Sequence, residues 1–338
     1  MGEGLMEQEL KNKRRKMTEK KKNNREVKFK ENVIEIEHLK KYYGQVKAVD
    51  DISFCVKKGE LFGFLGINGA GKSTTINMLC TLFAPTEGDA RICGYSVLKQ
   101  PEEIRKRIGI VYQNNCLDDK LTVLENLMVR GSLYEASGKK VKENAERVIE
   151  ELSLKEIIKR PFGKLSGGQK RKCEIARALM NTPEILFLDE PTTGLDPATR
   201  KNVWENMEVL RKERNMTVFL TTHYMEEAAK ANHIAILDKG KLKEYGTPFS
   251  LKESYAKDSL FILPKADKRE DVILQLKKQN REVLKRENRL LLPLHGTLEA
   301  VAILQQLQGQ IEGFEVMQGT LDDVFLNVTG KNLLDVEA

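Results

Sequence analysis

The chain has 338 residues, of which 40% are apolar and 32% charged, enough for one large domain and a smaller one. We expect no membrane-spanning helix, because its apolar runs fall short of the roughly 18 residues needed, and no secretory segment near the start. The five cysteines stand singly, which argues against a metal cluster or a disulfide framework and indicates reduced thiols of a cytosolic protein.

The net charge of +7 is concentrated in residues 1–30, where eleven Lys and Arg stand against five Asp and Glu. This stretch has too few apolar residues to fold, so we expect a basic, disordered tail over residues 1–31. The tail is a solvated extension, the product of a translation start placed too early, or a segment attracted to anionic lipid headgroups at about 1 kcal/mol per basic residue. No nucleic-acid partner is expected.

The first folded elements are predicted to be strands. Residues 32–57 have the pattern of strands with a turn at Gly44, and residues 60–66 (ELFGFLG) form an apolar run typical of a buried strand. Residues 72–82 (KSTTINMLCTL) then carry apolar residues at helical spacing. The region therefore begins with strands joined by a turn and continues with a buried strand, a loop and a helix.

The loop between that strand and helix fits the pattern G-x-x-x-x-G-K-[ST], from Gly66 to Ser73. Its glycines let the backbone turn N–H groups inward, next to the positive end of the helix dipole, which suits a polyphosphate. We expect Lys72 to reach the β- and γ-phosphates of ATP and the Ser73 hydroxyl to bind Mg²⁺. The alternative is a tight strand-to-helix turn without a ligand.

A pair of carboxylates follows a second apolar strand, residues 185–188 (ILFL). Pro191 ends the strand pattern directly after Asp189 and Glu190. A carboxylate at such a strand end, beside a phosphate loop, holds Mg²⁺ through water, which is the role expected of Asp189. Glu190 can then polarise the attacking water as general base. The alternative is a solvated turn.

A second anion site is predicted at residues 165–169 (LSGGQ), directly before a strongly helical stretch over residues 169–179. A helix N-terminus with a serine and two glycines binds anions through its backbone N–H groups. Because the chain already has a complete phosphate loop, a second anion site implies a second nucleotide or a second chain.

Together, the phosphate loop and the LSGGQ sequence resemble those of the ATP-binding subunit of an ABC transporter. The motif resemblance covers about residues 33–247, and the motifs occur in the family's order. It implies an α/β P-loop NTPase fold with a RecA-like core, an antiparallel β-layer and a helical subdomain, at about residues 114–180, that carries the LSGGQ sequence. We expect an ATP-binding domain over residues 32–248 and an accessory domain over residues 249–338.

The pattern of the residues agrees with that architecture. Strands alternate with helices over residues 60–112 and again over residues 185–246, which predicts a mainly parallel sheet. Between them, residues 122–180 have an almost entirely helical pattern, whose one clear interruption is predicted at residues 161–168.

The resemblance also assigns roles to single residues. Gln113 resembles the glutamine that senses Mg²⁺ and water, and His223 the histidine that contacts the γ-phosphate and orients the base, although a histidine after a strand can be a mere capping residue. Asp196 resembles the aspartate that links the two sites of a dimer. Tyr43 lies where the family stacks an aromatic ring on adenine, although either Tyr43 or its neighbour Tyr42 could be a packing residue.

Three sets of candidate residues result. The nucleotide-binding set is Tyr43, Gly66, Asn68, Gly69, Ala70, Gly71, Lys72, Ser73, Thr74, Ser166, Gly167, Gly168, Gln169 and Asp196. The catalytic set is Lys72, Gln113, Glu190 and His223, and the metal-binding set is Ser73, Gln113 and Asp189. Ile67 stands where the family usually has proline. Isoleucine should stiffen the loop less than proline does, without removing a contact.

The resemblance further implies partners. Ser166 and its loop would close over the γ-phosphate held by a partner subunit, so that two ATP molecules are sandwiched in a head-to-tail dimer. The sequence leaves open whether that dimer is a homodimer or a heterodimer. An integral-membrane permease would be a separate subunit, and the protein would lie at the cytoplasmic face of the cell membrane.

The last ninety residues predict a small α+β module. Strands and helices are expected in the order β-α-β-β-α-β, which suggests a ferredoxin-like fold, with Thr297 as the N-cap of its second helix and a closing helix behind it. The elements are predicted over residues 259–264, 267–278, 281–285, 289–294, 296–307, 314–317 and 321–328. The sequence TLDDVFL at residues 320–326 resembles the tail of daunorubicin-type drug-resistance ATPases, which pair with separately encoded exporter subunits. The alternative is a dimer-stabilising appendage.

Two functions are compatible with these motifs. The first is the ATPase subunit of an exporter for a drug-like or lipophilic substrate. The second is a soluble ABC-type ATPase in translation or DNA maintenance. Translation members usually carry two cassettes in one chain, and DNA-maintenance members split the cassette with a long coiled coil. This chain has one uninterrupted cassette, which favours the transporter.

Overall fold

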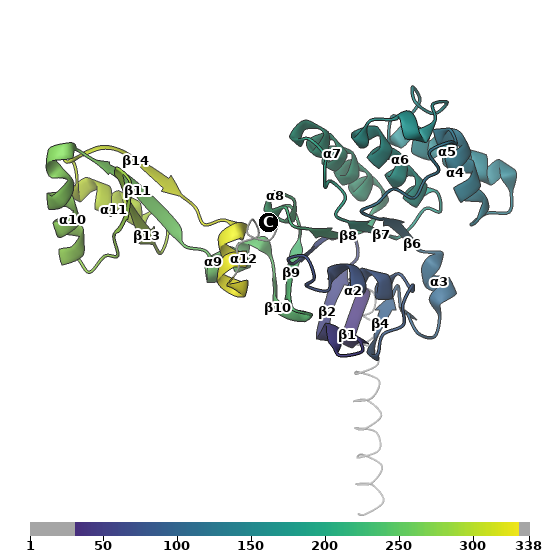
Figure 1. The fold of residues 1–338 in the computed structure, drawn as a ribbon, viewed down its shortest axis with the longest axis horizontal. Coiled ribbons are helices and arrows are strands. Elements are labelled where there is room, and N and C mark those ends of the chain that lie inside the picture. Colours follow the sequence, from purple (N-terminus) through teal and green to yellow (C-terminus); the bar gives the residue numbers. More distant parts are fainter. Residues whose placement is uncertain (1–30, 331–338) are drawn as a thin grey trace, which may run out of the picture. The chain divides into compact units, whose positions relative to one another are not determined.

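The computed structural model describes residues 31–330, so the basic tail expected over residues 1–31 lies, except for Glu31, outside the described residues. The chain divides into two compact units (Figure 1). Among the described residues, the first contains residues 31–223 together with Ala231–Leu242, and the second contains Tyr224–Lys230 and residues 243–330. The boundary expected between residues 248 and 249 remains a prediction.

Five strands at the centre of the first unit belong to a six-stranded sheet with the order β10-β9-β3-β8-β7-β6, in which only β10 crosses the boundary at residues 242–243. The pairs β3–β8, β3–β9, β6–β7 and β7–β8 are parallel, which confirms the mainly parallel sheet. All residues of β3 and β8 are buried, as expected for strands covered on both faces. The bounds are β3 Leu61–Leu65, β6 Ile108–Val111, β7 Ile185–Asp189, β8 Thr217–Thr222, β9 His233–Asp238 and β10 Lys241–Gly246.

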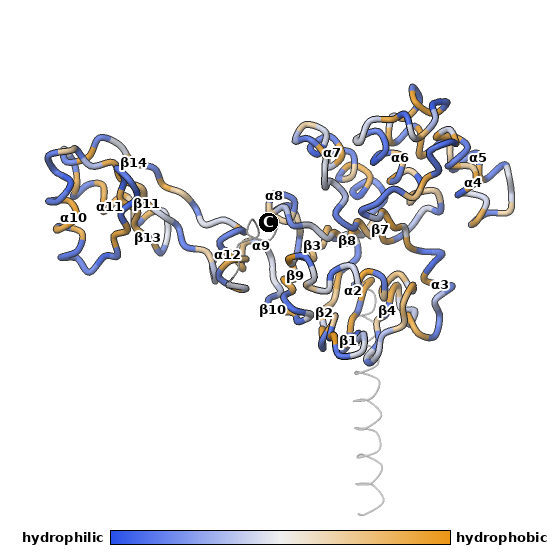
Figure 2. The backbone as a smooth tube through the Cα atoms, in the orientation of Figure 1, coloured by the Kyte–Doolittle hydropathy of each residue, from blue (hydrophilic) through white to orange (hydrophobic). Residues whose placement is uncertain are grey.

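A four-stranded antiparallel layer packs on this sheet, with the order β2-β1-β4-β5. The predicted turn at Gly44, where φ is +58°, joins β1 to β2. Phe54 of β2 stacks on Phe62 of β3 with ring centroids 5.3 Å apart. Both layers contain hydrophobic residues, which are orange in Figure 2. The bounds are β1 Asn32–Tyr43, β2 Val46–Lys57, β4 Glu87–Ile92 and β5 Tyr95–Ser96.

Helix α2 (Lys72–Leu79) lies between the two layers, because it contacts β2 and β4 on one side and β7 on the other. Two further helices of the first unit are α3 (Pro101–Arg105) and α7 (Pro197–Arg214), and the latter begins directly after the N-cap residue Asp196. The predicted order of strand, phosphate loop and helix is therefore confirmed, with the loop at the point where the two layers meet.

The helical subdomain consists of α4 (Val123–Ser132), α5 (Gly138–Glu151), a 3₁₀ turn η1 (Phe162–Lys164) and α6 (Gly167–Leu179). The predicted single interruption is wrong, because the helices also break at residues 133–137 and 152–161. Ser153 ends α5 with a left-handed φ of +54°, and the chain then returns to the start of α4, where Val123 N donates to Arg160 O at 3.1 Å.

The second unit contains a module whose four antiparallel strands have the order β12-β13-β11-β14. Helices α10 and α11 complete the order β-α-β-β-α-β and share a core with the sheet, which confirms the ferredoxin-like expectation. Its elements are β11 Asp258–Pro264, η2 Ala266–Lys268, α10 Arg269–Lys278, β12 Leu284–Arg286, β13 Arg289–Leu294, α11 Glu299–Gln306 and β14 Ile311–Met317, with α8 Met225–Ala228, α9 Pro248–Tyr255 and α12 Leu321–Thr329 outside the module.

Two predictions for the module are wrong in detail. Helix α11 has Leu298 rather than Thr297 at its N-cap, because residues 296–298 form a turn in which Glu299 N donates to Gly296 O at 3.0 Å. The first hairpin strand covers Leu284–Arg286 rather than residues 281–285. The closing helix α12 is confirmed, and Thr320 caps it in a reciprocal pair with Asp323.

Candidate active site

The phosphate loop has a backbone that glycine alone tolerates without strain. Gly71 has φ of +107°, and a Cβ there would lie 2.4 Å from the carbonyl oxygen of Ala48 in β2. Gly69 also has a positive φ, of +79°. On the far side of the loop, Gly240 N donates to Ala70 O at 2.9 Å, so the turn between β9 and β10 fixes the loop as well. The loop is thus held by β2 and by the β9–β10 turn.

Lys72, the first residue of α2, is buried beneath this loop with 5% of its side chain exposed. Its Nζ donates to the carbonyl oxygens of Gly66 at 2.7 Å and Ile67 at 3.3 Å, and lies 3.7 Å from Oε1 of Glu190. Burial lowers the pKa of the ammonium, while Glu190 and Asp189 favour its charged form. The loop therefore surrounds one cation.

Asp189 ends β7, Glu190 follows it directly, and both form hydrogen bonds to the neighbouring strand β8. The Thr221 hydroxyl donates to Oδ1 of Asp189 at 2.6 Å, and the backbone N–H of Glu190 donates to both oxygens of Thr221, each at 3.1 Å. Glu190 has a left-handed φ of +45°. A non-glycine residue in this conformation is strained, and such strain is often found at functional sites.

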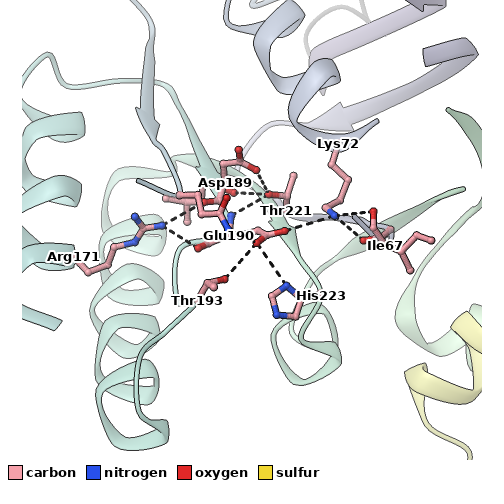
Figure 3. Close-up of polar contacts among 11 residues, drawn as sticks. Ile67, Lys72, Arg171, Asp189, Glu190, Thr193, Thr221 and His223 are labelled. Atoms are coloured by element: carbon pink, nitrogen blue, oxygen red, sulfur yellow. Dashed lines mark hydrogen bonds and ion pairs between the residues drawn. The ribbon is translucent and has the colours of Figure 1, made fainter. Parts of the chain in front are cut away.

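The carboxylate of Glu190 contacts side chains from several segments of the chain (Figure 3). Its Oε2 accepts hydrogen bonds from Gln113 Nε2 at 3.1 Å and Thr193 Oγ1 at 3.5 Å, and lies 3.7 Å from Nδ1 of His223. The contact with His223, followed by the charge of Lys72, lowers the pKa of Glu190 although the side chain is largely buried. The carboxylate is therefore ionised at neutral pH, as a general base must be.

A cavity of about 670 Å³ opens beside these groups. It is lined by predicted residues of the phosphate loop, of the start of α2 and of the catalytic set. Other lining residues, such as Lys47 and Lys239, were not predicted. Its lining comprises Tyr43, Val46, Lys47, Ala48, Ile67, Asn68, Gly69, Gly71, Lys72, Ser73, Thr74, Gln113, Glu190 and Lys239. Gly66 and Ala70 are buried in the loop itself.

The structure distinguishes Tyr43 from Tyr42. The ring of Tyr43 lines the cavity with 47% of its surface exposed, and the ammonium of Lys41 lies 5.2 Å from its centroid. The hydroxyl of Tyr42 instead donates to Asp50 at 2.8 Å, which ties β1 to β2. Tyr43 is thus the tyrosine that can stack on a flat ligand in this cavity.

The LSGGQ residues lie on a second cavity, of about 430 Å³, which Ser166, Gly168 and Gln169 line. Ser166 caps α6 in a reciprocal pair with Gln169, whose Oε1 accepts from Ser166 N at 3.1 Å. Asp196 caps α7 by accepting from Thr199 N at 3.0 Å. None of these residues, nor Gly167, lines the phosphate-loop cavity of the same chain.

Several residues of the site escaped sequence reasoning. Thr221 and Thr193 contact the carboxylates of Asp189 and Glu190, and Lys239 brings a further cation to the first cavity. Arg171, on α6, donates to the backbone behind Glu190. Lys239 could have been suspected from the sequence, because it is a basic residue in the short turn after β9. Thr221, Thr193 and Arg171 belong to the site only through contacts that the fold creates.

Comparison with known proteins agrees with this geometry. The family model for ABC transporters matches residues 49–193, and the model for the C-terminal domain of DrrA1-3-like ATP-binding proteins matches residues 246–329. The chain is 37% identical to the daunorubicin/doxorubicin resistance ATP-binding protein DrrA of Streptomyces peucetius, over 88% of this chain and 92% of that protein. It is 35% identical to the linearmycin resistance ATP-binding protein LnrL of Bacillus subtilis (strain 168), over 90% of this chain and 100% of that protein.

A solved structure supports the assignment of the first unit. The dimeric, post-hydrolysis state of the ATP-binding cassette MJ0796, bound to ADP and Pi, matches with a TM-score of 0.58 and 28% identity, over 63% of this chain and 98% of that chain. Among residues 31–330, no helix has the length and apolar character needed to cross a membrane. The chain belongs to the ATP-binding proteins of ABC transporters, of the DrrA type, and its cassette is an ATP-binding ATPase domain.

Proposed function

We propose that this protein hydrolyses ATP with Glu190 as general base and thereby drives export through a separate membrane permease. The observation that carries the proposal is the Glu190 carboxylate, which is ionised and contacts Lys72, Gln113 and His223 at the edge of the phosphate-loop cavity. In this arrangement Glu190 accepts a proton from the attacking water, and His223 and Gln113 orient the carboxylate.

The nucleotide-binding roles follow from the lining of the cavity. Tyr43 stacks on the adenine ring, and the backbone of residues 66–74 binds the polyphosphate beside the N-terminus of α2. Lys72 neutralises the β- and γ-phosphates. Lys47 and Lys239 add positive charge to the same cavity. A cavity with a flat aromatic side chain and several cations suits a nucleoside triphosphate.

The residues available for Mg²⁺ have suitable chemistry. Ser73 and Gln113 line the cavity, and Asp189 lies at the end of β7 beside it, with Oδ1 fixed by Thr221. Hydroxyl, amide and carboxylate oxygens are the hard ligands that Mg²⁺ prefers. We propose that these three residues hold the ion, directly or through water. Bound Mg²⁺ would neutralise charge on the phosphates.

We further propose that two subunits complete each site. The second cavity, with Ser166 at the N-terminus of α6, is an anion site separate from the phosphate loop. In a head-to-tail dimer Ser166, Gly167, Gly168 and Gln169 of one subunit face the γ-phosphate of the other, and Asp196 lies at the same interface. ATP then favours the closed dimer through its differential affinity for closed over open. The dimer is a homodimer or a heterodimer.

The relatives support export of a lipophilic, drug-like substrate, since their names refer to resistance against daunorubicin, doxorubicin and linearmycin. We propose that the protein binds a multi-span permease at the cytoplasmic face of the cell membrane. Residues 32–248 form the ATP-binding domain of this proposal, and residues 249–338 form the accessory domain.

The experiment that tests hydrolysis compares Glu190→Gln and Lys72→Ala with the unmodified protein. Glu190→Gln should bind ATP but hydrolyse it at least about a hundredfold more slowly, because it lacks the base. Lys72→Ala should weaken ATP binding. Normal turnover in Glu190→Gln contradicts the role of that residue. Co-purification from solubilised membranes tests whether the protein binds a membrane permease. Recovery of ribosomes or DNA without a multi-span protein would contradict the proposed role in transport.

A further inference from the structure

Helix α6 carries three buried charged residues at a spacing of three, Arg171, Glu174 and Arg177. Their exposed fractions are 5%, 0% and 6%. Buried charges are costly unless they are paired or hydrogen-bonded. Glu174 and Arg177 bind each other at 2.7 Å. Arg171 instead donates its hydrogen bonds to backbone carbonyl oxygens. Its buried charge is therefore balanced by backbone groups and not by a direct ion pair.

Four carbonyl oxygens accept from the Arg171 guanidinium. Three belong to consecutive residues that end and follow β7: Nη2 donates to Asp189 O at 3.4 Å and to Glu190 O at 3.2 Å, and Nε donates to Pro191 O. The fourth is Tyr112 O, to which Nη1 donates at 2.6 Å. One planar group on α6 therefore fixes the backbone at Glu190 and the residue before Gln113.

These contacts bear on the strained conformation of Glu190. A left-handed non-glycine residue persists where surrounding contacts fix it. At Glu190, Thr221 on β8 accepts from the backbone N–H, and Arg171 donates to the backbone oxygen. Thr221 belongs to the rigid central sheet, whereas Arg171 belongs to a helix whose first turn is capped by Ser166.

The distance along α6 from Ser166 to Arg171 is five residues, or about 7–8 Å at 1.5 Å per residue. Because a helix moves as a rigid element over this length, a shift of its N-terminus displaces the guanidinium, and the guanidinium holds the peptide groups around Glu190. We propose that Arg171 is a positioning residue that couples the Ser166 end of α6 to the conformation of the Glu190 carboxylate in the same subunit.

This inference rests on the proposed function. When Ser166 contacts the nucleotide of a partner subunit, Arg171 carries that change to the base of its own subunit. Each site then reaches its reactive geometry in response to occupation of the other. Arg171 itself touches neither substrate nor reacting atoms, so its loss should reduce kcat while leaving KM for ATP nearly unchanged.

The test compares Arg171→Lys with Arg177→Lys, each in the full-length protein. Lysine keeps the charge but cannot donate to four carbonyls in one plane. Arg177 is the matched control, because it is equally buried on α6 but donates to Glu174 and to Ile110 O within β6. We expect Arg171→Lys to lower kcat about tenfold to a hundredfold with KM within about twofold, and Arg177→Lys to lose a similar amount of stability without that loss of kcat.

A double-mutant cycle with Ser166→Ala tests the coupling. The effects of Arg171→Lys and Ser166→Ala on the logarithm of kcat should be less than additive, because both interrupt one connection. Additive effects, an unchanged kcat in Arg171→Lys, or equal losses of kcat in the two lysine variants would overturn the inference. If Arg171→Lys does not fold, Arg171→Gln, whose amide donates two hydrogen bonds, takes its place. Full turnover in Glu190→Gln would instead remove the proposed function itself.

Discussion

The side-chain amide of Gln113 donates a 3.1 Å hydrogen bond to Oε2 of Glu190, although the two residues are 77 positions apart in the chain. They meet because β6 and β7 are adjacent parallel strands, so the segments that follow them leave the same edge of the sheet. The contact connects the loop after β6 to the carboxylate that we propose as general base.

Replacing Gln113 by alanine should therefore slow hydrolysis more than it weakens ATP binding. A hydrogen bond to a charged group contributes about 1.5–3 kcal/mol, so kcat should fall by about one to two orders of magnitude. Asn115→Ala, in the same exposed loop, is the matched control and should leave kcat unchanged. Steady-state kinetics with direct nucleotide titration separates the two effects. A variant with normal kcat would contradict a role for this hydrogen bond in catalysis.

The pH dependence should report the environment of Glu190. Its pKa lies below the ordinary 4.5, with the contact to His223 as the largest cause, so the group stays ionised to lower pH than an unperturbed glutamate. The stability that ionised Glu190 contributes is present above pH 4.5 and is lost as pH falls through the lowered pKa. The acidic limb of kcat/KM that belongs to Glu190 should lie below pH 4.5 in the unmodified protein.

In His223→Ala that limb should move to higher pH, because the largest cause of the lowered pKa is gone. His38→Ala is the control, since His38 pairs with Asp51 at 2.8 Å. It should leave the pH profile of kcat/KM as it is. An acidic limb that is the same in His223→Ala and in the unmodified protein would contradict this account of the Glu190 environment.

Two glycines of the phosphate loop should differ in their tolerance of alanine. Gly69→Ala meets no atom of the described chain within 4 Å, so its cost should be the backbone strain of about 1–2 kcal/mol. Gly71→Ala adds a clash with the Ala48 carbonyl oxygen at 2.4 Å and should destabilise the protein further. Denaturant unfolding without nucleotide measures both free energies of unfolding. Equal values would show that β2 does not restrict the loop.

The neighbouring tyrosines should also separate in a binding experiment. Tyr43→Ala should weaken ATP binding by about 1–3 kcal/mol, the usual contribution of stacking an aromatic ring on a base. Tyr42→Phe removes the hydrogen bond to Asp50 and should leave ATP affinity unchanged. Calorimetric titration of each variant checks the pair. If Tyr42→Phe were the weaker binder, the assignment of the stacking residue would be reversed.

Several elements of the fold are determined by local sequence pattern. The buried strand before Gly66, the helix after Gly71 and the order of elements in the C-terminal module follow from hydrophobic spacing and glycine positions, and the structure confirms them. The end of α5 has no such signal, because the left-handed residue there is Ser153 and no glycine or proline marks the break. The start of α11 differs from the prediction at Thr297, because the turn of residues 296–298 delays the helix.

The candidate site was only partly accessible from sequence for a similar reason. Lys72 and Glu190 stand in motifs, so their proximity was expected before the structure placed them 3.7 Å apart. Thr221 and Arg171 belong to the site through hydrogen bonds to residues far along the chain, and a single sequence does not encode such pairings in any local pattern. The choice between Tyr42 and Tyr43 likewise required the register of β1 and β2.

We propose that ATP joins two subunits across the Ser166 face, and the mass of the purified Glu190→Gln protein with and without ATP reports this association. Light scattering should find a monomer without nucleotide and a dimer with ATP. Adding Ser166→Arg should abolish the dimer, whereas Ser137→Arg, at the N-cap position of α5, should not. A protein that stays monomeric with ATP, or a dimer that still forms with Ser166→Arg, would show that ATP does not join two subunits across the Ser166 face.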